Sequence, residues 1–409
     1  MNIYGRVVLA ALLLEFAIQL CASYLSLFSI LGKPPEIFAD VIDGQRYRRL
    51  QCYIQARTHL HTASEIFYLG VLLFFWFGGG FRWLAKWSAD WGFGPLWTGL
   101  LVIGAIALGR VLVALPFSAY FTFGIEASFG FNNTTLQTFL TDLLKAALLS
   151  VVIGGPLLSA ILTLLSHAVH YSWLYDWILV TVVFLFLQVI APNLILPLFN
   201  KFEPLKNRQL LDVISSYAAS VDFPLAAISV MDASTRSNKS NAFFTGFGSN
   251  HRLVLDDTLL NRHTVPELLA IVAHEVGHYK EKHIPLRVTM TVLQLGVFFL
   301  TMSFFLNAEG LFQAFYVDRQ SVYLGIVFFA LMYSPVAFAW SILLNWLARK
   351  QEYAADAFAA DTTRQPGAMA EALRKLAVDN LSHLAPHRLD VILNYSHPPL
   401  QNRVRALGA

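Results

Sequence analysis

Long uninterrupted apolar runs are the feature that most restricts how this chain can fold. Seven of them are long enough to cross about 30 Å of hydrocarbon as helices. They cover residues 7–31, 64–81, 97–120, 146–168, 173–198, 286–306 and 323–347. Charged residues make up only 13% of the chain, against about 25% in an average soluble protein, so a soluble core cannot absorb this apolar surface. The runs predict a mainly α-helical, polytopic membrane protein with about seven transmembrane helices.

Two polar segments, 199–285 and 348–409, interrupt the apolar runs. Two predicted spans separate them, so both segments emerge on the same side of the membrane. We therefore expect four parts along the chain: spans one to five with their loops (1–198), a first polar segment (199–285), spans six and seven (286–347), and a C-terminal polar segment (348–409).

The basic residues orient this arrangement. If the polar segments are inside, the loops 32–63 and 121–145 are inside too. Five Lys or Arg residues then lie inside in 32–63, ten in 199–287 and eight in 348–409. The outside holds Arg6, Arg82, Lys86 and Arg319. The positive-inside rule thus predicts that the polar segments are cytoplasmic and that the N-terminus is outside.

Net charge and cysteine content exclude other classes of protein. A formal charge of +3 is too small to indicate a nucleic-acid partner. The two cysteines, Cys21 and Cys52, form no Cys-x-x-Cys pair, which excludes a disulfide scaffold and a cysteine zinc site.

The stretch HTVPELLAIVAHEVGHYKEKH, residues 263–283, carries a metal-binding pattern. A Thr-x-x-Glu capping box beginning at Thr264 predicts the start of a helix. On that helix His274 and His278 share one face and can bind one Zn²⁺ through neutral imidazole nitrogens. Glu275 is offset by one position, where the general base for a metal-bound water belongs.

The alternative for this stretch is a solvated amphipathic helix whose polar face happens to carry histidine. We favour that simpler interpretation for Lys280, Lys282 and His283, which continue the polar face.

Catalytic zinc takes a third protein ligand and keeps an open position. The best candidate lies in LARKQEYAADAFAADT, residues 347–362. Glu352 and Asp356 share a face at i and i+4, so one can bind zinc while the other orients a ligand histidine through its second nitrogen. Two carboxylates on a solvated helix face are the alternative.

The chain end, SHPPLQNRVRALGA, holds a further cluster. His397 precedes two prolines that impose a rigid turn, and Arg403 and Arg405 follow on a short predicted helix. A histidine or arginine aimed at the site can stabilise an oxyanion. A surface tail is the alternative.

A small β-structure is predicted before the metal motif. LAAISVMDAS alternates weakly, and NAFFTGFGSNHRLVLDD indicates a β-hairpin around Gly-Phe-Gly-Ser-Asn. An edge strand beside a zinc helix can bind an extended peptide as an added strand, and Asn241 is then placed to hydrogen-bond the substrate backbone. A purely structural hairpin fits the pattern equally well.

Taken in order, NAFFTGFG, HEVGH, EYAADAFA and SHPPLQNRVRAL resemble the integral-membrane type I CAAX prenyl endopeptidases. Residues 123–145, 193–205 and 232–248 extend this resemblance. It implies seven spans enclosing a chamber, with a cytoplasmic gluzincin-like zinc metallopeptidase domain that holds one Zn²⁺ per chain. The roles it implies are zinc ligands at His274, His278 and Glu352, general base at Glu275, ligand-orienting carboxylate at Asp356, carbonyl-oxygen stabiliser at His397, bracing arginine at Arg403, and substrate contact at Asn241.

The function implied is hydrolysis of peptide bonds near the C-terminus of prenylated, CAAX-type peptides. The expected partners are a peptide or protein substrate and the lipid bilayer, with no nucleic acid, and the oligomeric state is left open. One alternative is a membrane-protein quality-control zinc protease without prenyl specificity, which usually has fewer spans. Another is a non-catalytic zinc-binding transporter. The C-terminal RALGA carries no retention or prenylation signal, which favours a bacterial inner membrane over the endoplasmic reticulum.

Overall fold

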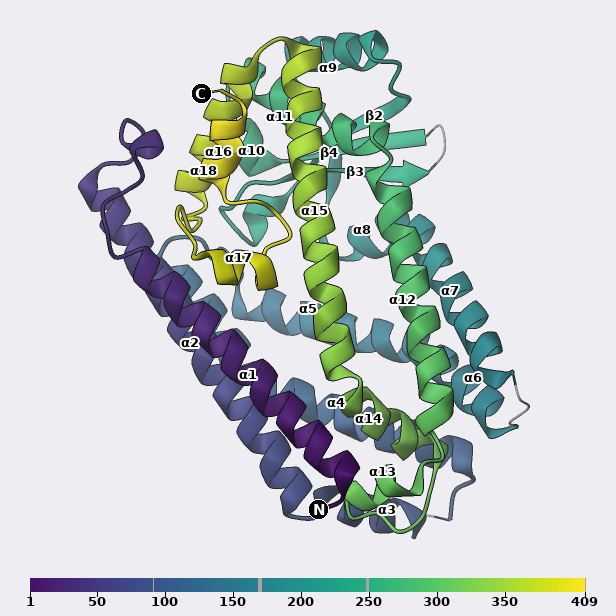
Figure 1. Cartoon of the computed structure of the whole chain (residues 1–409). Coiled ribbons are helices and arrows are strands. Elements are labelled where there is room, and N and C mark those ends of the chain that lie inside the picture. Colours follow the sequence, from purple (N-terminus) through teal and green to yellow (C-terminus); the bar gives the residue numbers. More distant parts are fainter. Residues whose placement is uncertain (91, 168–170, 248–249, 409) are drawn as a thin grey trace.

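The computed structural model describes residues 1–90, 92–167, 171–247 and 250–408 (Figure 1). Within these residues, six helical runs are long and apolar enough to cross a membrane, and a bent pair makes a seventh. They are α1 (Ile3–Ser29), α2 (Gly44–Phe77), α4 (Pro95–Ala119) with a π-helical turn to Glu126, α5 (Leu136–Leu149) joined to α6 (Gly155–Ser166), α7 (Ser172–Ile190) continued to α8 (Leu196–Phe199), α12 (His283–Phe305), and the pair α14 (Val322–Met332) and α15 (Ser334–Thr363). Each overlaps one of the seven predicted runs, so the prediction of a mainly α-helical membrane protein with about seven spans is confirmed.

The seventh span differs from the single straight helix that its sequence predicts. It is broken into α14 and α15, which meet at an angle of 53°. Pro335 lies in the first turn of α15. Proline lacks an N–H and its ring clashes with the preceding turn, so a helix tends to end or bend just before it.

Two spanning helices also extend into stretches that we predicted as loop or as a separate segment. α2 begins at Gly44, capped by Asp43, so the charged stretch before the apolar run is helical. α15 continues to Thr363 without a break. The expected boundary at residue 348 therefore falls inside one continuous helix, which joins the seventh span to the residues that follow it.

Among the described residues, one four-stranded sheet lies at one end of the molecule (Figure 1). Its strands are β1 (Phe202–Pro204), β2 (Leu225–Met231), β3 (Ala242–Phe247) and β4 (Asn250–Asp256), in the spatial order β1-β2-β4-β3. β2 and β4 are parallel, and the other two pairs are antiparallel. The predicted hairpin is thus β3 with β4, and β3 forms one edge of the sheet. Residues 248 and 249 of its turn lie outside the described residues.

One apolar core lies at each end of the molecule. Near the N-terminus, α3 (Gly80–Ala89), α13 (Glu309–Ala314) and α14 pack around buried aromatic residues that include Trp76, Phe315 and Phe328. At the opposite end, α9 (Arg208–Ser220), α11 (Val265–Lys280) and the sheet enclose a second apolar core. The remaining helices at this end are α10 (Asp257–Leu260), α16 (Pro366–Asp379), α17 (Arg388–Asn394) and α18 (Leu400–Ala406). This second core positions the polar cluster described next.

Candidate metal centre

The helix α11 begins where the capping box predicts. The Thr264 side chain accepts from the backbone N–H of Glu267, and the Glu267 carboxylate accepts from the backbone N–H of Thr264. Glu267 is buried and also accepts a hydrogen bond of 2.6 Å from Lys375 on α16. The start of α11 is therefore tied to a neighbouring helix.

One face of α11 packs closely against α15. Gly277 lies where an added Cβ would be 3.0 Å from the Cα of Ala355, so the two backbones approach unusually near one another. In Figure 1, α11 and the later half of α15 run side by side at the end that holds the sheet. This approach brings the histidines of α11 to the carboxylates of α15.

Three metal-binding side chains from the two helices converge. His274 Nε2 lies 3.2 Å from His278 Nε2 and 3.5 Å from Glu352 Oε2, and His278 Nε2 lies 3.4 Å from Glu352 Oε1. A tetrahedral zinc ion with ligand bonds of about 2.1 Å holds its ligand atoms roughly 3.4 Å apart. Two imidazoles and a carboxylate are also a donor set that zinc accepts. The three residues therefore fit a zinc ion in both chemistry and spacing.

A buried carboxylate and arginine support this group. Asp356 Oδ1 lies 2.9 Å from His274 Nδ1, the nitrogen that faces away from the other donors. Arg403 on α18 donates two hydrogen bonds of 2.7 Å to Asp356, from Nε and Nη2. Its third nitrogen, Nη1, lies 3.2 Å from Glu352 Oε2. All four side chains are buried. Such partners hold a ligand histidine in one tautomer and one orientation.

Electrostatics at this centre follow from burial and from these partners. Burial by itself lowers the pKa of His274, but hydrogen bonds to Asp356 and Glu352 outweigh it and raise the pKa to about 9 in the metal-free protein. Burial raises the pKa of Glu275 above its ordinary value, an effect that the neighbouring histidines only partly offset. A carboxyl whose pKa moves toward neutrality is suited to take up and release a proton.

His397 lies at the rim of the cluster. Its Nε2 is 3.4 Å from Glu352 Oε1, and 63% of its side chain is exposed. Arg349 on α15 donates to the carbonyl oxygens of Val391 and Tyr395, at 2.8 and 2.6 Å. Those contacts hold the segment leading to His397 against α15. We did not identify Arg349 from the sequence, because its partners are backbone oxygens 42 and 46 residues away.

Asn241 lies outside this cluster, immediately before the edge strand β3. It is exposed, and its backbone oxygen accepts a hydrogen bond from the N–H of Asp256. The structure therefore places it on the sheet edge, as the sequence predicts, and its contact with substrate stays a prediction.

The interpretation of His283 as part of a solvated polar face is wrong. His283 is buried, and its Nδ1 lies 2.9 Å from Nδ1 of His278. Arg287, one turn further along α12, donates to Gln351 at 2.6 Å and lies 3.9 Å from Glu352. Neither contact follows from helical periodicity, because a turn at Lys282 redirects the chain between α11 and α12.

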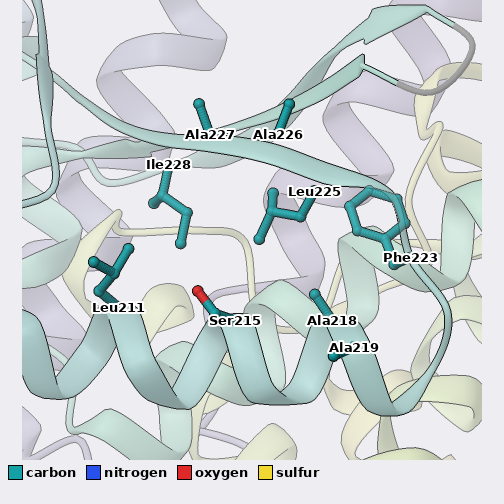
Figure 2. A pocket seen from close by; sticks show the side chains of 9 residues that line it. All are labelled: Leu211, Ser215, Ala218, Ala219, Phe223, Leu225, Ala226, Ala227 and Ile228. Carbon is teal, nitrogen blue, oxygen red and sulfur yellow. The ribbon is translucent and has the colours of Figure 1, made fainter.

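A separate pocket of about 240 Å³ lies between α9 and β2 (Figure 2). Most of the side chains that line it are apolar, and the Ser215 hydroxyl is a polar group that faces into it. The three proposed metal ligands and their partners Asp356 and Arg403 do not line this pocket, so it is not part of the candidate metal centre.

The fold and the site together define a membrane-embedded metallopeptidase. Residues 25–201 match the family model described as CAAX prenyl protease N-terminal, five membrane helices, and residues 204–409 match that of peptidase family M48. The chain therefore belongs to the M48 peptidases of the CAAX prenyl protease type, and it is a metalloendopeptidase.

Relatives and solved structures agree with this assignment. The CAAX prenyl protease 1 homolog of Arabidopsis thaliana is 34% identical over 388 residues, covering 91% of this chain and 90% of the relative. The Homo sapiens homolog is 31% identical over 429 residues, with 91% and 88% covered. The crystal structure of S. mikatae Ste24p superposes with a TM-score of 0.94 at 29% identity, covering 100% of both chains.

The comparisons give no support to a bacterial inner membrane. The relatives named above come from eukaryotes. The expectation rested on a missing C-terminal retention signal, and the absence of one short signal does not identify a compartment.

Proposed function

We propose that this chain is a zinc endopeptidase that cleaves peptide bonds near the C-terminus of prenylated, CAAX-type peptides. His274, His278 and Glu352 would hold one Zn²⁺. The observation that carries this proposal is that the two Nε2 atoms lie 3.2 Å apart and that each lies within 3.5 Å of one oxygen of the Glu352 carboxylate. This spacing suits a tetrahedral ion with one position left open.

Zinc, when bound, lowers the pKa of a coordinated water and polarises the scissile carbonyl. Glu275 takes the proton of the attacking water and delivers it to the leaving amine. Its position next to His274 on α11 and its raised pKa suit both transfers. His397, exposed at the rim 3.4 Å from Glu352, donates to the developing oxyanion.

Asp356 and Arg403 act on the ligands rather than on the substrate. Asp356 accepts from His274 Nδ1 and thereby leaves Nε2 free for the metal. Arg403 neutralises Asp356 and lies near Glu352, so that two buried carboxylates stay ionised side by side.

The substrate peptide adds to the free edge of β3, with Asn241 hydrogen-bonding its backbone. Main-chain pairing of this kind selects peptides in an extended conformation and does not select a particular side chain. Specificity for a prenyl group then depends on apolar surface elsewhere, which we assign to a chamber between the spanning helices. The names of the relatives support a prenylated substrate for this chain.

We also propose that the polar segments 199–285 and 348–409 form the catalytic unit on the cytoplasmic side, while 1–198 and 286–347 supply the spans. The excess of Lys and Arg in these segments and in 32–63 supports this orientation. The span count and the match to a membrane N-terminal family model favour a CAAX protease over a quality-control protease.

The experiment that tests this proposal compares two peptides with purified protein in detergent. One is a farnesylated CAAX peptide and the other is the same peptide without the lipid, with Glu275→Gln as the inactive control. We expect preferential cleavage of the farnesylated peptide, abolished in the variant. Equal cleavage of both would remove prenyl specificity from the proposal, and cleavage of neither would overturn the substrate assignment.

A further inference from the structure

The buried histidine His283 contacts the proposed ligand His278 on the side of the ring that faces away from His274 and Glu352. The two Nδ1 atoms lie 2.9 Å apart, a normal hydrogen-bond distance. The rings meet edge to face, with centroids 5.0 Å apart and an interplanar angle of 69°. His283 is only 6% exposed, so solvent does not compete freely for this contact.

The tautomers of this pair follow from which nitrogen of His278 faces the other two proposed ligands. Nε2 of His278 is the atom that lies near His274 and Glu352. A nitrogen that binds a metal must offer a lone pair, so the proton of a neutral His278 is on Nδ1. That N–H donates to His283, whose Nδ1 must then be unprotonated and carry its own proton on Nε2.

The chain geometry between the two helices makes this contact possible. α11 ends at Lys280, and Lys282 adopts a left-handed conformation with φ of 56° and ψ of 35°. His283 is the first residue of α12, so the turn folds it back over the last turn of α11. A non-glycine residue in this conformation is uncommon and costs free energy, which the surrounding contacts must offset.

We propose that His283 is a positioning residue that fixes the tautomer and orientation of the zinc ligand His278. This inference rests on the proposed function, because it takes His278 as a ligand. The two ligand histidines are then held differently: His274 by the anionic Asp356 and His278 by a neutral imidazole. Partners of this kind typically change metal affinity by about 10- to 100-fold when removed.

The test measures zinc affinity by competition with a chromophoric chelator, on full-length protein in detergent. His283→Leu keeps a similar bulk but offers no acceptor, whereas His283→Asn places Oδ1 near the position of the Nδ1 atom. We expect the affinity of the leucine variant to fall by about 10- to 100-fold and that of the asparagine variant to stay much closer to wild type. Lys282→Gly, which changes the same turn but not the contact, is the matched control and should bind zinc as wild type does.

The thermal midpoint of each metal-free variant separates positioning from folding. Equal midpoints with unequal zinc affinities for the leucine and asparagine variants support the inference. Wild-type affinity in His283→Leu, or equal weakening in both variants, overturns it, since packing alone would then account for the residue. Failure of the proposed function looks different: His274→Ala would bind zinc as tightly as wild type.

Discussion

Gly277 on α11 lies directly against Ala355 on α15. A Cβ at Gly277 would be 3.0 Å from the Cα of Ala355 and 3.2 Å from its carbonyl oxygen. Both are backbone atoms, so neither can turn aside as a side chain can. The separation of the two helices, and with it the distance from the histidines to Glu352, therefore depends on a missing methyl group.

Gly277→Ala should push α11 away from α15 and so move His274 and His278 away from Glu352. Overpacking of a well-packed core costs about 1–3 kcal/mol, and we expect a loss of unfolding free energy in that range together with weaker zinc binding. Thermal unfolding and chelator competition measure the two effects. Gly367→Ala is the control, because a Cβ there meets nothing within 4 Å. Wild-type zinc affinity in Gly277→Ala would contradict the spacing argument.

Glu275→Gln should retain zinc and lose cleavage. The amide has nearly the shape of the carboxylate but cannot accept the proton of water, and general-base catalysis contributes about 10²- to 10⁴-fold to rate. Elemental analysis and single-turnover peptide cleavage measure the two properties. Glu281→Gln, just beyond the end of α11, serves as the control. A Glu275→Gln enzyme of normal activity would end the proposed mechanism.

Zinc removal should abolish activity, and restored zinc should return it. Dialysis against a strong chelator, followed by one equivalent of Zn²⁺, tests this on the wild type. His274→Ala should neither retain zinc nor recover, because two ligands bind too weakly to replace three. Stoichiometric metal in that variant would show that His274 is not a ligand.

Arg403→Met should destabilise the protein, whereas Arg405→Met on the same helix should not. Arg403 is buried and paired with Asp356, while Arg405 is exposed. Removing one partner of a buried pair leaves an uncompensated charge and costs about 3–5 kcal/mol. Denaturant unfolding compares the two variants. Equal stability would mean that the buried carboxylates do not depend on Arg403.

Asn241→Ala should raise KM for a peptide substrate and leave zinc content unchanged. The loss of one hydrogen bond to substrate predicts an effect of about 0.5–1.5 kcal/mol, or up to about tenfold. Asn261→Ala, at the exposed residue following α10, is the control. An unchanged KM would separate Asn241 from substrate binding and leave the sheet edge without a tested role.

Sequence patterns within a single helix predicted the features of this protein that lie within that helix. The spans follow from apolar length, the start of α11 from its capping box, and the pairs His274 with His278 and Glu352 with Asp356 from helical spacing. The bend of the seventh span has a local signal too, Pro335 in the first turn of α15. The prediction for His283 is wrong because α11 ends at Lys280, so its helical periodicity does not extend to residue 283.

The sequence by itself determined a membrane protein of about seven helical spans, a capped helix with two histidines on one face, and a later helix with two carboxylates on one face. It specified these because helix length and the 3.6-residue repeat act within a few residues of one another. Only the tertiary structure decided that the two faces meet, that Arg403 closes over Asp356, and that His283 turns back onto His278. Those contacts join residues that are far apart in the chain or lie across a turn, and the meeting of the two faces depends on the close approach of two backbones at Gly277 and Ala355.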